Sequence, residues 1–188
     1  MPTDAPSRTD AIAAGEWAID AERSSVAFTL KHLMFKKVKG SFREFRGALQ
    51  SSDGELSAGG AVIAASIDTG DAIRDQHLRE SADFFDVAAC PEITFSSTRI
   101  ELPGDGTIAV VGDLQMRGIT RSVELQGTII TPAPAEGDPD RLELHVHGEV
   151  DRADFGLTWN QKLDTGGALL GNTVKIDLVL VAARIPAG

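Results

Sequence analysis

Two histidines placed two residues apart are the first candidates for chemistry. His145 and His147 alternate with apolar residues in the segment 141–151, so they should face the same side of a strand. Two imidazoles could bind a metal ion if a neighbouring strand supplied a third ligand. No spacing indicates such a ligand, and Glu143 and Glu149 share the same face. The pattern therefore favours a solvated polar face over a metal site.

A cysteine and a histidine could together act as nucleophile and general base. Cys90 is the only cysteine in the chain, which excludes an internal disulfide, and His77 precedes it in an irregular segment. No turn that could bind an oxyanion is indicated beside either residue. The pattern favours an inert, partly buried thiol over a catalytic pair.

Two further segments have the composition of ligand sites without the required spacing. Gly166–Gly171 is rich in glycine, but it has no Lys-Ser or Lys-Thr pair and no strand-to-helix context, so it is not expected to bind phosphate. A group of aspartates lacks the alternate positions and terminal glutamate of a calcium loop. Solvation and a helix N-terminus explain this group better; it consists of Asp68, Asp71, Asp75, Asp83 and Asp86. Binding is therefore favoured over catalysis.

The segments that must position these residues are mostly strands. Apolar and polar residues alternate with period two, as between Ser24 and His32, and turn signals separate the runs. Gly40 and Gly47 are expected to mark bends or bulges. The predicted strands are residues 15–20, 24–32, 38–49, 60–67, 93–101, 107–116, 119–131, 141–151 and 174–183. This pattern predicts an all-β protein with an antiparallel, closed β-barrel of about eight strands, and a sandwich is the alternative.

One segment interrupts the alternation. Residues 66–86 contain no proline, and charged residues recur at helical spacing, as in Asp71, Asp75 and Arg79. The segment ends in Phe84 and Phe85. We expect a short helical insertion that covers the barrel like a lid, with its two aromatic residues turned inward and its charges facing water.

Length and charge limit the remaining possibilities. The chain of 188 residues suits one domain, expected over residues 15–188 after a flexible tail at 1–14, and 132–140 is expected to be a solvent loop. The net charge of −10 argues against a nucleic-acid partner and against adsorption to anionic lipid through charge alone. No signal peptide or membrane span is indicated, so we expect a soluble, cytoplasmic protein. One basic cluster is expected to protect an edge strand; it comprises Lys31, Lys36, Lys37, Lys39, Arg43 and Arg46.

The apolar residues are the most informative candidates. The chain has 8 phenylalanines and 2 tryptophans but no tyrosine, so its large aromatic groups are almost all purely apolar. A packed core is the ordinary interpretation of such residues. A closed barrel with an apolar lining and a lid could instead hold an apolar ligand. Composition leaves both interpretations open.

The combined motifs resemble the YceI-like, polyisoprenoid-binding family over about residues 16–183. The resemblance is carried by Lys31–Met34, Ile67–Leu78, Ala82–Asp86, Pro91–Phe95, Gly112–Leu114, Arg117–Arg121, Asp154–Asn160, Gly171 and Val174–Ile176. It implies an extended lipocalin-like barrel whose interior holds a long isoprenoid, of the quinone or polyprenyl type, for carriage or storage. It also implies a binding protein that is not an enzyme and needs no cofactor, and it makes a homodimer plausible.

The resemblance turns the inward-facing residues into expected ligand contacts. Arg74, Arg79 and His32 are candidates to receive a polar head group at the barrel mouth, and a surface or structural role is the alternative for each of them. Two alternatives stay open: an enzyme that acts on an amphipathic lipid through His77, Cys90 or His32, and a stress or interaction module with a packed core. The expected ligand-binding residues are Phe28, Leu30, His32, Met34, Phe42, Phe45, Ile67, Leu78, Phe84, Phe85, Phe95, Val110, Leu114, Met116, Phe155 and Trp159.

Overall fold

The computed structural model describes residues 12–130 and 140–188. Most of the predicted tail and of the predicted 132–140 loop therefore lies outside the described residues. The last tail residues do not fit the prediction, because Ile12 is only 3% exposed and packs against Trp17 in the core. Trp17 also donates a hydrogen bond from its Nε1 to the carbonyl of Ala13 over 3.0 Å. Ordered packing thus begins no later than Ile12, because burial of this apolar residue offsets the entropy lost on ordering.

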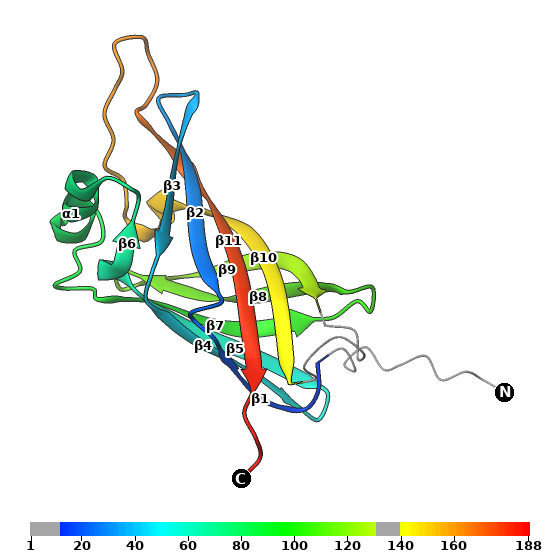
Figure 1. Ribbon diagram of the computed structural model, residues 1–188. Coiled ribbons are helices and arrows are strands. Elements are labelled where there is room, and N and C mark those ends of the chain that lie inside the picture. Colours follow the sequence, from blue (N-terminus) through cyan, green and yellow to red (C-terminus); the bar gives the residue numbers. More distant parts are fainter. Residues whose placement is uncertain (1–11, 131–139) are drawn as a thin grey trace.

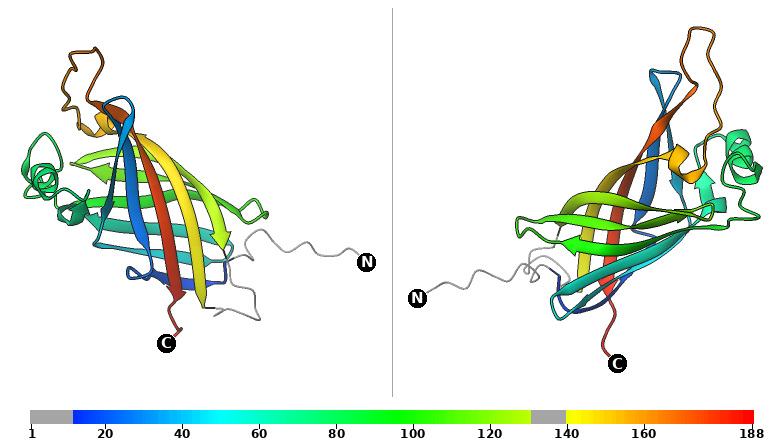
Figure 2. Two further views of the ribbon diagram at one scale, coloured as in Figure 1. Left: turned by 45° about the horizontal axis from the view of Figure 1, so that its top comes forward. Right: turned by 180° about the vertical axis from the view of Figure 1, so that it is seen from behind.

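The strands form one antiparallel barrel (Figures 1 and 2). Eight of the strands in the described part of the chain close the ring in the order β1-β4-β5-β7-β8-β9-β10-β11 and back to β1. The closed barrel predicted from the alternation is confirmed, and the sandwich alternative is wrong. The strands are β1 Gly15–Ile19, β2 Ser25–His32, β3 Lys36–Phe42, β4 Phe45–Ser52, β5 Glu55–Ile63, β6 Ile67–Asp68, β7 Glu92–Glu101, β8 Thr107–Met116, β9 Ile119–Ile130, β10 Arg141–Asp151 and β11 Leu170–Arg184.

Three of the strands continue as a second tier above this ring. β2 pairs with the first half of β11, β3 pairs with β2, and the two-residue strand β6 pairs with the end of β3. Each continues one ring strand after a short break, so that β1 leads into β2, β3 into β4, and β5 into β6. We call this extension, β2-β3-β6, the upper flap. It makes one wall of the barrel taller than the rest (Figure 1).

Two predicted strands are each broken where the flap meets the ring. The predicted strand 38–49 is interrupted at Arg43 and Glu44, and the predicted run 60–67 ends at Ile63. A 3₁₀ turn, Ala64–Ser66, separates it from β6. The two breaks lie against each other: the backbone N–H of Glu44 donates a hydrogen bond to the Ser66 hydroxyl over 3.0 Å. These local bonds satisfy backbone groups that a continuous ladder would otherwise use.

The two glycines expected at bends, Gly40 and Gly47, lie in regular ladders where the chain is closely approached. Gly40 pairs regularly with Phe28, and a Cβ on Gly40 would lie 2.4 Å from that ring. Gly112 serves Phe95 in the same way, also at 2.4 Å. Gly47 likewise sits in a regular ladder, opposite Gly60. The prediction of bends or bulges at Gly40 and Gly47 is therefore wrong, because missing side chains are used here for close approach and not for backbone freedom.

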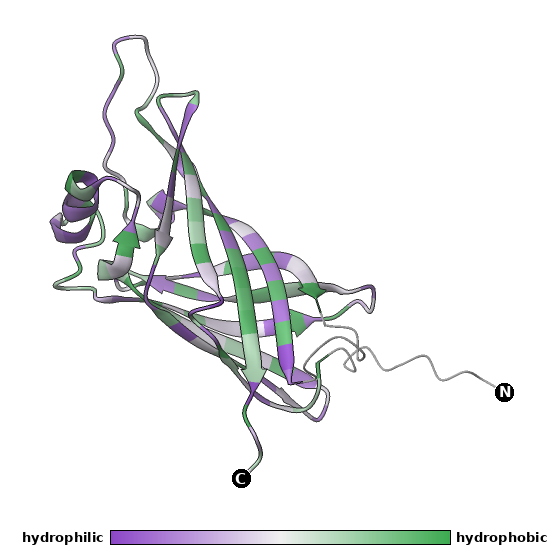
Figure 3. Ribbon diagram, in the orientation of Figure 1, coloured by the Kyte–Doolittle hydropathy of each residue, from purple (hydrophilic) through white to green (hydrophobic). Residues whose placement is uncertain are grey.

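The barrel is solid at one end and open at the other. A cluster around Trp17, Leu49 and Leu142 fills the end near the C-terminus, and the segment beginning at Ile12 packs against it. A second cluster, around Phe42, Ile67 and Ile93, lies toward the flap. Apolar and polar residues alternate along the strands, as the bands in Figure 3 show. The alternation that predicted the strands also separates the apolar lining from the polar outer wall.

The predicted lid is shorter and less regular than one helix. Only Ala72–Glu80, α1, is helical in the segment 66–86. Asp71 caps the N-terminus by accepting hydrogen bonds from the backbone N–H groups of Ile73 and Arg74. The helix ends before Ser81, so Phe84 and Phe85 lie in the turn that follows it. The prediction that the aromatic pair belongs to a helix is wrong, because capping and turn formation end the helix first.

Candidate functional site

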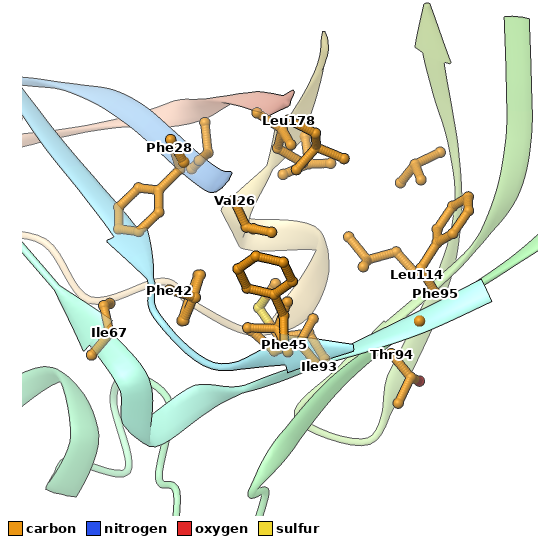
Figure 4. Close-up of a pocket in the computed structure, with 18 of the residues that line it drawn as sticks. Val26, Phe28, Phe42, Phe45, Ile67, Ile93, Thr94, Phe95, Leu114 and Leu178 are labelled. Carbon is orange, nitrogen blue, oxygen red and sulfur yellow. The ribbon is translucent and has the colours of Figure 1, made fainter. Parts of the chain in front are cut away.

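A large apolar cavity runs through the barrel interior, from the flap to Leu49, Ile108 and Leu180 of the ring. Its volume is about 510 Å³, and its walls come from both the ring and the upper flap. Figure 4 shows Phe28, Phe42 and Phe45 with Ile93 and Leu178 around this space. Protein interiors contain few voids larger than one water molecule, which takes up about 30 Å³ in the liquid. A space of this size is within the range of ligand pockets and is far larger than a packing defect.

Nearly all of the expected ligand-binding residues line this cavity. Met34 does not: its side chain is 57% exposed at the turn between β2 and β3. It departs from the prediction because the strand ends at His32 and the inward alternation ends with it. Whether the lining residues bind a ligand stays a prediction. Those that line the cavity are Phe28, Leu30, His32, Phe42, Phe45, Ile67, Leu78, Phe84, Phe85, Phe95, Val110, Leu114, Met116, Phe155 and Trp159.

Aromatic contacts join the lid segment to the barrel. The rings of Phe84 and Trp159 lie with centroids 5.5 Å apart, and His77 meets Phe84 edge-on at 5.3 Å. Phe85 meets Phe42 edge-on at 5.8 Å. Tilted and edge-to-face geometries are the favourable ones for such rings. These contacts place the two phenylalanines against the lining, as the lid prediction required, although they follow the helix.

A polar network holds α1 against the flap. The carboxylate of Asp75, which is 5% exposed, accepts hydrogen bonds from the backbone N–H of Thr69 over 3.0 Å and from its hydroxyl over 2.5 Å. Arg74 donates from Nε to the same hydroxyl over 2.7 Å and from Nη2 to the Thr69 carbonyl over 2.9 Å. The buried carboxylate of Asp75 therefore has hydrogen-bond donors, and the bonds among Asp75, Thr69 and Arg74 stabilise the attachment of the lid.

Two further arginines fix the backbone on either side of α1. Arg79 donates to the carbonyls of Ala65 and Ile67 over 2.7 and 2.8 Å. Arg117, from the β8–β9 turn, donates to the carbonyl of Ala82 over 2.8 Å and also to that of Phe84. Arg79 is therefore a structural residue, and it does not line the cavity. Of the two roles expected for Arg79, head-group contact and structural residue, its position outside the lining favours the structural one.

Two carboxylates at the base of the lid are stabilised in their charged forms. The pKa of Asp71 lies below its ordinary value of 3.8, chiefly because the backbone N–H of Arg74 donates to it. The pKa of Asp68 is also lowered, first by the backbone N–H of Gly70 and then by the Arg43 side chain. Asp71 is exposed and Asp68 is half-buried, so solvent screens these charges and their effects act locally on the lid and its connection to the flap.

Arg152 is a cavity residue that sequence reasoning missed. Only 5% of it is exposed, and it donates from Nε to the Gly171 carbonyl over 2.9 Å and from Nη1 to the carbonyls of Leu157 and Trp159 over 2.5 and 2.9 Å. Its Nη2 is buried without a hydrogen-bond partner among the described residues. Burial lowers the pKa of this guanidinium. A signal was available, because the inward positions of β10 are even-numbered and residue 152 continues that series.

Few polar groups reach the lining. His32 and Arg74 do, as two of the three predicted head-group residues, and so do Thr69, His77 and Arg152; these positions are near the open end, at the end of β2, in the lid or after β10. Arg46 and Thr94 also line the cavity, from β4 and β7. Elsewhere the walls are almost wholly apolar. An amphipathic ligand would therefore find apolar surface inside and hydrogen-bond donors at the mouth.

The other candidate groups lie away from the cavity. His145 and His147 point outward, and the His145 Nε2 lies 2.5 Å from Glu143 Oε1. Cys90 is half-buried and outside the lining. Within residues 12–130 and 140–188, no cluster of three His, Cys, Asp or Glu side chains could hold a metal ion. Among these residues there is also no helix with the length and apolarity needed to cross a bilayer.

Comparisons with known proteins agree with this architecture. A family model described as the YceI-like domain matches residues 17–182. A UPF0312 protein of Staphylococcus aureus strain MSSA476 is 36% identical over 168 residues, which cover 86% of this chain and 93% of the relative.

Solved structures share the fold at lower identity. Burkholderia cenocepacia BcnA has a TM-score of 0.75 at 23% identity, covering 88% of this chain and 99% of its own. A polyisoprenoid binding domain from Saccharophagus degradans has a TM-score of 0.70 at 16% identity, covering 90% and 98%. Given the barrel, the lid and the match over nearly all of its length, this chain belongs to the YceI-like family.

Proposed function

We propose that this protein binds a long isoprenoid lipid, of the quinone or polyprenyl type, inside the barrel and carries or stores it. The observation that supports this most directly is the apolar cavity of about 510 Å³ beneath the lid. One related fold belongs to a domain described as polyisoprenoid-binding, which supports the ligand class. The family and the lack of any clustered nucleophile and base in the lining favour binding over catalysis.

The chemistry of the lining suits a long hydrocarbon better than a compact polar molecule. Burial of each methylene-sized group contributes about 0.8 kcal/mol, so an isoprene unit of about five carbons contributes roughly 4 kcal/mol before losses. Ordering a flexible chain offsets part of this gain. A few units inside the cavity are then enough for tight binding. Selectivity would follow chain length and the depth of the space between Phe28 and Phe95.

The head group should remain at the mouth, where the polar groups are gathered. His32 and Arg74 lie there, and the buried Nη2 of Arg152 is a spare donor beside Trp159. An oxygen-bearing head group, such as a quinone carbonyl or a prenyl hydroxyl or phosphate, is an acceptor that these donors could meet. The ligand would then bind tail first, with its oxygen atoms outermost.

Recovery and rebinding of lipid test the proposal. Organic extracts of the purified protein, analysed by mass spectrometry, should contain a long isoprenoid. Delipidated protein should bind an added long-chain quinone with a change in tryptophan emission, because Trp159 lines the cavity while Trp17 is buried in the solid end. In the Trp159→Phe variant, Trp17 still emits but the change should vanish. Empty extracts together with no binding of quinone or polyprenol would refute the proposal.

A further inference from the structure

The turn between β2 and β3 exposes large apolar side chains at the open end of the barrel. Phe35 is 91% exposed and Met34 is 57% exposed. The turn projects beyond the ring on the tall side of the molecule, opposite to the end that carries the C-terminus (Figures 1 and 2). Placing a phenylalanine wholly in water forfeits the stabilisation that its burial would provide. Such a residue at the tip of a projecting turn therefore requires an explanation beyond folding.

The turn does not have the residues that its backbone prefers. Leu33 and Met34 are consecutive residues with positive φ values of 52° and 59°. Glycine or asparagine adopts this conformation with less strain and is typical of such hairpin turns. Apolar residues here are thus unfavourable both for the turn and for solvation.

Lysines surround this apolar tip. Lys31, Lys36, Lys37 and Lys39 are all exposed on β2 and β3, and none forms an ion pair within the described residues. Protection of an edge strand accounts for part of this pattern, since β3 pairs with β6 only through its last two residues. Edge protection does not account for Phe35, because an exposed phenylalanine promotes the association that lysines prevent.

The charge of the whole chain makes the cluster stand out. The net charge is −10, so these cations lie at one end of an otherwise acidic protein. On the neighbouring 157–169 loop, the exposed Lys162 is balanced by Asp164. An anionic surface would attract the tip and repel the rest of the molecule, which orients the protein as well as attracting it.

The tip is continuous with the cavity mouth. The backbone N–H of Leu33 donates to the Leu169 carbonyl over 2.9 Å, so the turn and the 157–169 loop lie side by side. Leu169 lines the cavity, and so do Leu30 and His32 immediately before the turn. A surface that holds the tip would therefore lie directly beside the route into the barrel.

We propose that the β2–β3 turn docks on an anionic phospholipid bilayer, with Phe35 and Met34 in the interfacial layer and the four lysines at the lipid phosphates. This combination of apolar insertion and basic surroundings is the chemistry of reversible membrane-surface binding. The inference deepens the proposed function, on which it rests, by naming the surface with which the barrel exchanges its lipid.

Vesicle flotation tests the inference on the full chain. The probes are vesicles of phosphatidylcholine alone and vesicles of about seven parts phosphatidylcholine to three parts phosphatidylglycerol. The wild type should float with the anionic vesicles and not with the neutral ones. The double variant Lys36→Gln/Lys37→Gln should lower the partition constant about 30-fold, from about fivefold for each lysine near the surface. Phe35→Ser should lower it roughly tenfold.

Matched controls exclude general effects of charge or apolar surface. Arg23→Gln/Arg99→Gln removes the same charge from exposed arginines on the outer wall, and Ile185→Ser removes an apolar side chain that is 45% exposed at the opposite end of the barrel. Both should bind anionic vesicles as the wild type does. Circular dichroism and the lipid content of each variant show that folding and the cavity are intact.

Three outcomes would overturn the inference. The first is failure of the wild type to float with anionic vesicles, and the second is equal loss in the tip variants and their controls. The third is self-association that Phe35→Ser abolishes in the absence of vesicle binding, which would assign the tip to a second copy of the chain. Vesicle binding by a protein that yields no isoprenoid on extraction and binds no added quinone or polyprenol would instead refute the proposed function and leave the docking surface standing.

Discussion

Arg152 holds Trp159 in place through the backbone: its Nη1 donates to the Trp159 carbonyl over 2.9 Å. The same guanidinium reaches the carbonyls of Leu157 and Gly171, which lie on either side of the long loop at the mouth. One buried charge thus gathers both ends of this loop around the aromatic residue that faces Phe84. The loop and the lid are consequently coupled through the ring of Trp159, which meets the rings of Phe84 and His77.

Removal of that guanidinium should loosen the loop. In Arg152→Met, three charge-assisted hydrogen bonds are lost while the volume is largely kept, so we expect the free energy of unfolding to fall by roughly 1–3 kcal/mol. Hydrogen exchange should quicken at residues 157–171 before it does in the strands of the ring. Chemical denaturation and exchange mass spectrometry measure both, and Arg121→Met, at an exposed position, is the control. If hydrogen exchange in Arg152→Met quickened equally in the loop and in the ring strands, this role of Arg152 would be contradicted.

A bulky residue pointing into the cavity should block the ligand without harming the fold. Val110 lines the cavity, whereas Val111 is next to it on β8 and faces away from the lining. Val110→Trp should weaken isoprenoid binding at least about tenfold, because several buried methylene contacts are displaced. Val111→Trp should bind as the wild type does. Titration with a long-chain quinone compares the two; equal affinities would place the ligand elsewhere.

The attachment of the lid should weaken in acid. The pKa of Asp71 is lowered in the folded protein. Its contribution to the stability of α1 is therefore fully present above the ordinary pKa of 3.8 and is lost as the pH falls below that value. Hydrogen exchange of α1, corrected for the intrinsic rate, should be constant from neutral pH down to about pH 5 and should quicken in more acidic solution. Asp71→Asn still caps the helix but does not titrate at this site. Its remaining pH dependence should be smaller, and an unchanged profile would exclude this carboxylate as the cause.

Filling the space above Gly112 should displace Phe95. A Cβ there would lie 2.4 Å from the ring, so Gly112→Ala must push Phe95 off its position and should destabilise the protein by about 1–3 kcal/mol. Phe95→Leu should recover part of this loss in the double variant, because the shorter side chain leaves room for the methyl group. Thermal unfolding of the four members of this cycle gives the coupling energy. Additive losses would mean that the ring and the glycine do not interact.

The alternation of apolar and polar side chains predicts most of the fold. Along β10 it separated the inward Leu142, Leu144 and Val146 from the outward His145 and His147, and the structure keeps that separation. Period-two patterns are informative because one register slip would turn every apolar side chain into water. The number of strands left two ways to shield the apolar face, a second sheet or closure, and the pairing of β1 with β11 shows that the sheet closes.

Features that depend on distant partners could not be predicted in this way. Phe28 gives no sign that Gly40 must lie beneath its ring, because their contact is between strands. Met34 lies in an apolar run that breaks the alternation after β2, and local composition does not show whether such a residue faces the cavity or the solvent. Arg152 kept the inward parity of its strand, but a charged residue is not expected inside an apolar barrel until its carbonyl partners are known.

The two tiers of the barrel differ in the number of residue pairs that hold their strands together. Within the upper flap, β3 and β6 share two residue pairs, Ser41–Asp68 and Phe42–Ile67, whereas β5 and β7 in the ring share a ladder of five residue pairs. Breaking the weaker seam leaves all eight ring strands closed. We therefore expect local opening to begin between β3 and β6, which would widen the entrance while the ring stays closed.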